Sequence, residues 1–124
     1  MRLGNDYHDG WVLANGVKTH YCWAGTEGPA VILLHGAGPG VSGEAGWRYM
    51  LPELAKAGFR AYAVDQISMG YTDKRPHAWP VRGQQSLVDH VADFVDALCL
   101  DEVYVVGNSQ ASYVAAKYAI DYPE

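Results

Sequence analysis

The stretch 105–117, VVGNSQASYVAAK, decides the fold class of this 124-residue chain. Its first residues predict a buried strand and its last ones a helix, with only Gly107-Asn108-Ser109-Gln110-Ala111 between them. So sharp a strand-to-helix turn brings neighbouring side chains close to the backbone, and the small residues at 107 and 111 meet that requirement. The turn would point Ser109 outward at a helix N-terminus, where negative charge is stabilised.

The remaining strands can be placed from turn signals and apolar runs. WVLANGVKTHYCWAG (11–25) predicts a β-hairpin, because two β-favouring runs flank Asn15-Gly16. A continuous apolar run at 30–36 predicts a strand covered on both faces. Residues 59–65 predict a second buried strand that ends on an acid, and residues 102–107 predict a third strand.

Helices are expected between these strands. Residues 43–58 have helical apolar spacing and a stop at Gly58, and Pro52 is expected near the start of the helix proper. Residues 86–100 form an amphipathic pattern with Ser86 as the N-terminal cap, and a last helix runs from 111 to near Pro123. Alternating strands and helices indicate parallel strands joined by right-handed crossovers. The fold class is therefore α/β, with an antiparallel hairpin leading in.

Composition indicates one soluble domain over residues 1–124, since 49% of the residues are hydrophobic. A net charge of −5 with scattered Lys and Arg argues against a nucleic-acid partner. No run has membrane-spanning length and MRLGNDYHDG lacks a signal-peptide core, so we expect a cytoplasmic protein. Cys22 and Cys99 fit neither a disulfide framework nor a metal-ligand spacing, and are expected to be buried thiols.

The glycine-rich turn HGAGPG (35–40) is a second candidate for chemistry. The dinucleotide pattern fails because Val41 stands where the third glycine belongs, and no Gly-Lys-Ser/Thr follows for a phosphate loop. Two readings remain: backbone N–H groups that hold an oxyanion, or a tight structural turn.

Other polar residues give weaker signals. Asp65, at the end of the strand 59–65, could be a metal ligand or a general base, but capping of a neighbouring turn is favoured. His90 is expected to be a partly exposed helix residue, and His8, His20 and His77 show no partner pattern. No histidine pair has zinc spacing, and none is a convincing catalytic base.

The order of these features resembles the α/β-hydrolase superfamily over nearly the whole chain. It comprises a strand before His-Gly-x-Gly-Pro-Gly, a strand ending in Asp, and a strand leading into Gly-x-Ser-x-small. HGAGPGVSGEAGWR, GYTDK and VVGNS are most similar to the meta-cleavage product hydrolases. Those enzymes hydrolyse a carbon–carbon bond in vinylogous 1,5-diketones formed by ring cleavage of aromatic compounds.

The resemblance implies a role for each matching residue. Ser109 would be the nucleophile, and Asn108 would help to hold the dienoate end of the substrate. Ala37 and Gly38 would line one side of the oxyanion hole, with the backbone N–H of Gln110 opposite. No cofactor and no metal are implied, and the partner is a small-molecule substrate.

Three features of the sequence depart from the family pattern. Gly46 stands where an asparagine usually precedes the tryptophan of the oxyanion-side loop, so one amide for the substrate carboxylate is missing. The elbow reads Gly-Asn-Ser-Gln-Ala-Ser rather than Gly-Asn-Ser-Met-Gly-Gly, and Ser68 replaces a glycine.

The catalytic partners of Ser109 are also missing from these residues. The triad order on this fold is Ser, then Asp or Glu, then His, yet no histidine follows Ser109 and Asp121 comes too early. We therefore expect the N-terminal portion of a single α/β-hydrolase domain, without lid and C-terminal half and inactive alone. An ester or lactone hydrolase and a non-catalytic binding module stay open as alternatives, as does a homo-oligomer of the longer protein.

Overall fold

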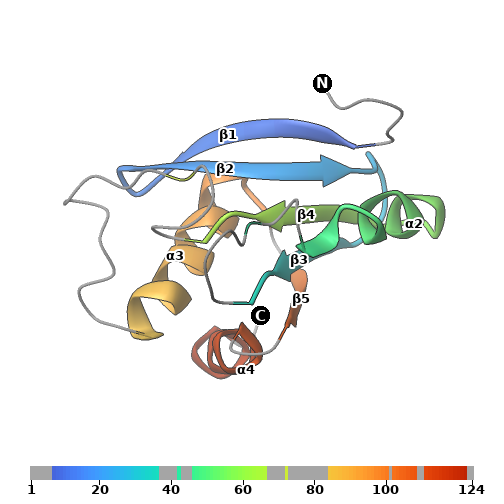
Figure 1. The fold of residues 1–124 in the computed structure, drawn as a ribbon. Coiled ribbons are helices and arrows are strands. Elements are labelled where there is room, and N and C mark those ends of the chain that lie inside the picture. Colours follow the sequence, from blue (N-terminus) through green and yellow to red (C-terminus); the bar gives the residue numbers. More distant parts are fainter. Residues whose placement is uncertain are drawn as a thin grey trace.

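The computed structural model describes residues 7–36, 42, 46–66, 72, 84–100, 102–108 and 111–122. Within them, a sheet has the strand order β1-β2-β4-β3-β5 (Figure 1). Its strands are β1 (His8–Ala14), β2 (Val17–Ala24), β3 (Ala30–Leu34), β4 (Arg60–Val64) and β5 (Val103–Gly107). The helices are α2 (Met50–Lys56), α3 (Gln84–Ala97) and α4 (Ala111–Asp121).

The predicted topology is confirmed. β3 pairs in parallel with both β4 and β5, whereas β2 pairs antiparallel with β1 and with β4. The hairpin turns at Asn15 and Gly16, whose φ angles of 49° and 86° are the left-handed pair that a two-residue hairpin loop favours. That turn fixes the register of the hairpin, in which Asp9 faces Cys22 and Trp11 faces His20.

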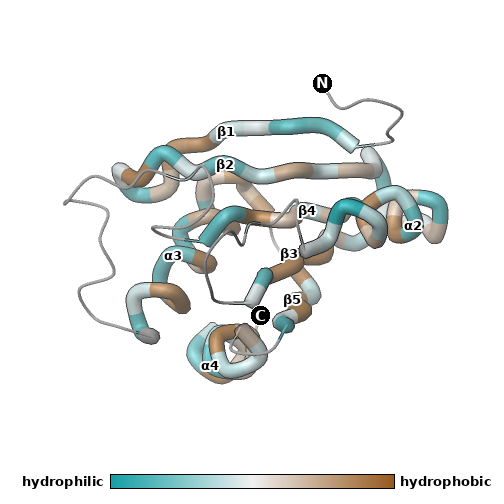
Figure 2. The backbone as a smooth tube through the Cα atoms, in the orientation of Figure 1, coloured by the Kyte–Doolittle hydropathy of each residue, from teal (hydrophilic) through white to brown (hydrophobic). Residues whose placement is uncertain are grey.

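Helices cover both faces of the sheet because alternate residues of each strand point to opposite sides. Ile32 and Leu34 of β3 pack in one apolar core with α3 and α4. Val31 and Leu33 pack in a second core, on the side of α2. β3 lies between β4 and β5 and is buried along its whole length; Figure 2 shows its hydrophobic residues in brown.

The helix expected over 43–58 is shorter in the structure, and α2 begins at Met50. Pro52 lies in its first turn, where a missing backbone N–H costs no intrahelical hydrogen bond, as predicted. The helix ends at Lys56, Gly58 follows its C-cap with φ of 95°, and the Phe59 N–H closes back on the Leu54 carbonyl at 3.0 Å. This is a Schellman ending, for which glycine is the preferred residue.

Two predicted details of the α3–β5 segment are wrong. Ser86 is not the N-terminal cap, because α3 starts at Gln84 and includes it. The strand that opens the stretch 105–117 is not fully buried as expected: Val106 is 43% exposed, and Tyr104 of the same strand is 62% exposed. β5 is an edge strand of the described sheet, and its outer residues lack cover. The apolar stripe of α3 is confirmed, since Val91 and Phe94 are fully buried.

His90 is buried, which corrects the expectation of a partly exposed helix residue. It lies three residues after Leu87 and four before Phe94, on the apolar face of α3, and is only 3% exposed. The Thr19 hydroxyl donates to the Val17 carbonyl at 3.0 Å, so its oxygen accepts from Nε2 of His90 at 2.9 Å. Burial lowers the pKa of His90 to about 4.

Acid is expected to destabilise the protein through His90. Its folded pKa lies below the unfolded value of 6.5, so between these values the unfolded chain binds more protons. Stability is therefore retained above pH 6.5 and lost as the pH falls towards 4, by about 2 kcal/mol at pH 5. Urea unfolding of the full-length protein at pH 7.5 and pH 5 measures this loss.

His90→Gln is the matched control, because glutamine keeps an N–H donor for Thr19 and does not titrate in this range. The variant should lose about 2 kcal/mol less than the wild type between the two pH values. Equal losses in both proteins would show that His90 does not set the acid sensitivity.

Candidate active site

The turn after β5 is as tight as predicted. A Cβ at Gly107 would lie 2.1 Å from the Ala111 carbonyl oxygen, and both of the other near atoms are backbone. The Asn108 N–H extends the sheet by donating to the Leu34 carbonyl at 3.1 Å, and the Ala111 N–H donates to the Asn108 carbonyl at 3.0 Å. The chain therefore passes from strand to helix within a few residues, which only glycine at 107 permits.

Four of the predicted site residues lie outside the described residues: Ala37, Gly38, Ser109 and Gln110. The described residues that precede them in the sequence are Gly36 and Asn108. β3 and β5 are adjacent and parallel, so Gly36 and Asn108 follow them at the same end of the sheet, the carboxyl end of its parallel strands. Asn108, the residue expected at the dienoate end of the substrate, is exposed there.

His35 and Gln66 hold the carboxyl ends of β3 and β4 together. His35 Nε2 accepts the Gln66 backbone N–H at 3.2 Å, so Nδ1 carries the proton and donates to the Gly36 carbonyl at 2.7 Å. The Gln66 side chain donates to the His35 carbonyl at 2.7 Å. Burial lowers the pKa of His35, which keeps the ring neutral. The residues before the glycine-rich turn are thus firmly positioned.

Gly46 also lies at this carboxyl end of the sheet, beside His35. A Cβ built on it would be 3.5 Å from Cβ of His35, an ordinary van der Waals distance. Gly46 is exposed, and its N–H donates to the Ser42 carbonyl at 3.1 Å. The position expected to face the substrate carboxylate therefore lies beside the first residue of HGAGPG and has room for a side chain.

A buried His–Asp pair at the carboxyl end of β4 could not be recognised from the sequence. His20 Nδ1 donates to Asp65 Oδ2 at 2.8 Å and Nε2 to Asp9 Oδ1 at 3.2 Å. The backbone N–H of His20 also donates to the Thr72 hydroxyl, which in turn donates to the backbone carbonyl of Asp65 at 2.6 Å. Burial alone lowers the pKa of His20, but the two carboxylates outweigh burial and raise it. Asp65 is an ion-pair partner rather than only a turn cap.

The His20–Asp65 pair does not lie beside the elbow. β3 separates β4 from β5, so the end of β4 is two strand spacings, about 10 Å, from the end of β5. His35 is nearer, but both of its ring nitrogens are engaged in hydrogen bonds. That no histidine of this chain serves as the base for Ser109 stays a prediction, because Ser109 lies outside the described residues.

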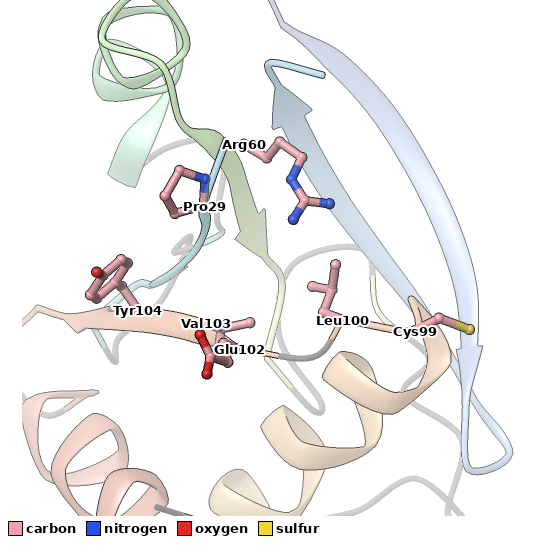
Figure 3. A pocket seen from close by; sticks show the side chains of 7 residues that line it. All are labelled: Pro29, Arg60, Cys99, Leu100, Glu102, Val103 and Tyr104. Carbon is pink, nitrogen blue, oxygen red and sulfur yellow. The ribbon is translucent and has the colours of Figure 1, made fainter. Parts of the chain in front are cut away.

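A hollow of about 810 Å³ lies at the opposite end of the sheet, where the parallel strands begin (Figure 3). Its wall includes Pro29, Arg60 and Val103, which stand at or just before the starts of β3, β4 and β5. Ligands of open α/β sheets bind outside the carboxyl ends of the strands. This hollow is therefore not the candidate active site. Cys99, also in its wall, is exposed, which corrects the expectation of a buried thiol, whereas Cys22 is buried as expected.

A tight strand-to-helix turn after β5, on a mixed sheet covered by helices on both faces, is typical of the α/β-hydrolase fold. Residues 29–124 match the family model described as alpha/beta hydrolase fold, and the chain belongs to that family. No helix in the described part of the chain has the length and apolar character needed to cross a membrane.

The chain is similar in sequence to hydrolases of ring-cleavage products. The chain is 42% identical over 112 residues to a 2-hydroxy-6-oxo-2,4-heptadienoate hydrolase of Pseudomonas putida, an alignment that covers 90% of this chain and 39% of the relative. The chain thus spans about two-fifths of the length of that relative.

The solved structures that the chain resembles are also hydrolases, as two examples illustrate. The chain superposes on a serine-to-alanine variant of a meta-cleavage product hydrolase from Pseudomonas fluorescens, in complex with acetates. The TM-score is 0.85 at 41% identity, over 93% of this chain and 41% of that one. An epoxide hydrolase from an endophytic Streptomyces superposes with a TM-score of 0.82 at 34% identity, over 95% of this chain and 34% of that one. Similar folds thus serve different substrates, and the fold alone does not choose between them.

Proposed function

We propose that the full-length protein is a serine-dependent hydrolase that cleaves a carbon–carbon bond in a 2-hydroxy-6-oxo-dienoate formed by ring cleavage of an aromatic compound. The observation that carries the proposal is the turn at the end of β5, which requires glycine at 107 and leads directly into Ser109. The relative at 42% identity is named for a substrate of this class, which supports the choice of substrate.

In the proposed reaction, Ser109 Oγ adds to the ketone carbonyl of the substrate. Backbone N–H groups of the 37–38 turn and of Gln110 stabilise the oxyanion. The carbon–carbon bond then breaks, the dienoate fragment takes up a proton, and water hydrolyses the acyl-serine to the carboxylic acid. Asn108 holds the dienoate end. Because no histidine follows Ser109 in the sequence, the base and its acid partner are proposed to lie outside these 124 residues.

The discriminating experiment uses the full-length protein and two substrates. Loss of the dienoate chromophore under pseudo-first-order conditions reports carbon–carbon cleavage, and release of p-nitrophenol from its esters reports ester hydrolysis. Rapid ester turnover without dienoate cleavage would favour the ester or lactone hydrolase, and inactivity on both would favour the non-catalytic binding module. Cytoplasmic location, the absence of a nucleic-acid partner and assembly as a homo-oligomer stay predictions of the sequence.

Residues 1–124 expressed alone are expected to have negligible activity on either substrate. A serine without its base is a weak nucleophile, and the oxyanion hole alone leaves only about 10³- to 10⁴-fold acceleration over water. The open edge at β5 also leaves strand backbone unpaired. The measurement compares kcat/KM of this segment with that of the full-length protein at equal concentration; comparable values would contradict the expectation.

Gly46→Asn is expected to lower KM for the dienoate about tenfold, because the new amide can donate a hydrogen bond to the substrate carboxylate. The site has room, since the nearest neighbour of the new Cβ is 3.5 Å away. Steady-state kinetics of the full-length variant provide the measurement, and p-nitrophenyl acetate, which has no carboxylate, is the control substrate. An unchanged KM for the dienoate would show that position 46 does not face the carboxylate.

A further inference from the structure

Three different ligand types converge on the face of the β1–β2 hairpin that adjoins α2. The carboxylate of Asp9, the imidazole of His20 and the thiol of Cys22 offer one ligand atom each, and these atoms lie within 4.8 Å of one another. Asp9 and Cys22 face each other across the strand pair, and His20 is two residues from Cys22 on the same face. The cluster is a product of the hairpin register and lies apart from the elbow.

The spacing of these atoms fits a tetrahedral cation. Asp9 Oδ1 is 3.2 Å from His20 Nε2 and 3.4 Å from Cys22 Sγ. Zinc bonds of about 2.1 Å to nitrogen and oxygen and about 2.3 Å to sulfur give tetrahedral edges of about 3.4 Å and 3.6 Å. The two edges that meet at Asp9 would therefore each lengthen by about 0.2 Å to admit the ion, and all three ligand atoms already lie within 4.8 Å of one another.

Asp65 supplies the support that a histidine ligand needs. Its carboxylate is fully buried and accepts the proton of His20 Nδ1 at 2.8 Å, which leaves Nε2 facing Asp9 and Cys22. Histidine ligands of metals usually donate their other ring N–H to a carboxylate in this way, which fixes the ring and raises its basicity. The Trp11 ring, 4.9 Å from the His20 ring, covers the imidazole further.

Charge also permits the exchange of protons for a dication. The cluster without metal holds a proton on Cys22 Sγ and one on His20 Nε2, the latter shared with Asp9. Binding a divalent cation releases both protons, so the formal charge of the cluster does not change. Asp9 is 31% exposed and gives the ion a path from solvent, whereas the His20 side chain is only 4% exposed.

We propose that Asp9, His20 and Cys22 form a site for Zn²⁺, with Asp65 as the buried partner of His20 and a water as the fourth ligand. Sulfur, nitrogen and carboxylate oxygen together suit zinc, whereas Mg²⁺ prefers oxygen ligands alone. The site would join β1 to β2 and, through Asp65, to the end of β4. It is independent of the proposed hydrolysis, because β2 and β1 lie three and four strand spacings from β5.

The test is titration of the metal-free full-length protein with Zn²⁺ alone, followed by calorimetry and by the shift in thermal unfolding temperature. One equivalent should bind and raise the unfolding temperature, and Mg²⁺ should do neither. Asp9→Asn and Cys22→Ala should each lower the zinc affinity at least tenfold, and Asp65→Asn should lower it about 10- to 100-fold. Asp9→Asn is the safest of these variants for folding, since the side chain is partly exposed.

Cys99→Gly is the matched control for thiol binding. It removes the other cysteine at a position whose φ of 58° suits glycine, and it should leave the zinc affinity unchanged. Absence of stoichiometric binding to the wild type would overturn the proposal. So would binding that survives in both Asp9→Asn and Cys22→Ala, or binding that is lost only in Cys99→Gly.

Discussion

Ser109→Ala in the full-length protein is expected to lower kcat for dienoate cleavage by at least about 10³-fold, with little change in KM. The hydroxyl is the proposed nucleophile, and without it no acyl-enzyme can form. What would remain is the contribution of the oxyanion hole and of binding, which is small beside that of an intact nucleophile and base. Single-turnover decay of the dienoate chromophore measures the effect and separates chemistry from binding.

The matched control is Ser112→Ala, three residues further along the chain. Ser112 is exposed and donates only to the Gly107 carbonyl at 3.2 Å, so its loss should change kcat less than twofold. If Ser109→Ala retains the wild-type rate, the serine mechanism is wrong. If both variants lose activity equally, the turn itself rather than the nucleophile is the sensitive feature.

Gly107→Ala is expected to destabilise the protein by about 3 kcal/mol or more, or to prevent folding. The added Cβ would approach the Ala111 carbonyl oxygen to 2.1 Å and the Ser112 nitrogen to 2.8 Å. Neither atom can move aside without shifting the first turn of α4. Urea unfolding of the full-length variant, followed by circular dichroism, gives the change in the free energy of unfolding.

Gly46→Ala is the control for this prediction. Its new Cβ would meet Cβ of His35 at 3.5 Å, an ordinary contact, and the change in stability should stay within about 0.5 kcal/mol. A Gly107→Ala variant as stable as Gly46→Ala would mean that the strand-to-helix turn is wider than the structure shows.

Much of the fold could be predicted because its signals are local. Asn15-Gly16 specified the hairpin and its register, the continuous apolar run at 30–36 specified the buried central strand, and Gly58 ended α2. The need for glycine at 107 could also be predicted, since the turn is formed by residues adjacent in the chain. The errors arose where burial depends on distant segments, as for Val106 on the uncovered edge strand.

The sequence by itself determined the elements, their α/β order and the tight strand-to-helix turn after Gly107, because these follow from contacts between residues near one another in the chain. Only the tertiary structure decided the partners of His20 and His90. Asp65 is 45 residues from His20, and Thr19 is 71 residues from His90. Both contacts exist because β2 lies beside β4 and α3 packs on the hairpin, and that order depends on how whole strands and helices bury their apolar faces.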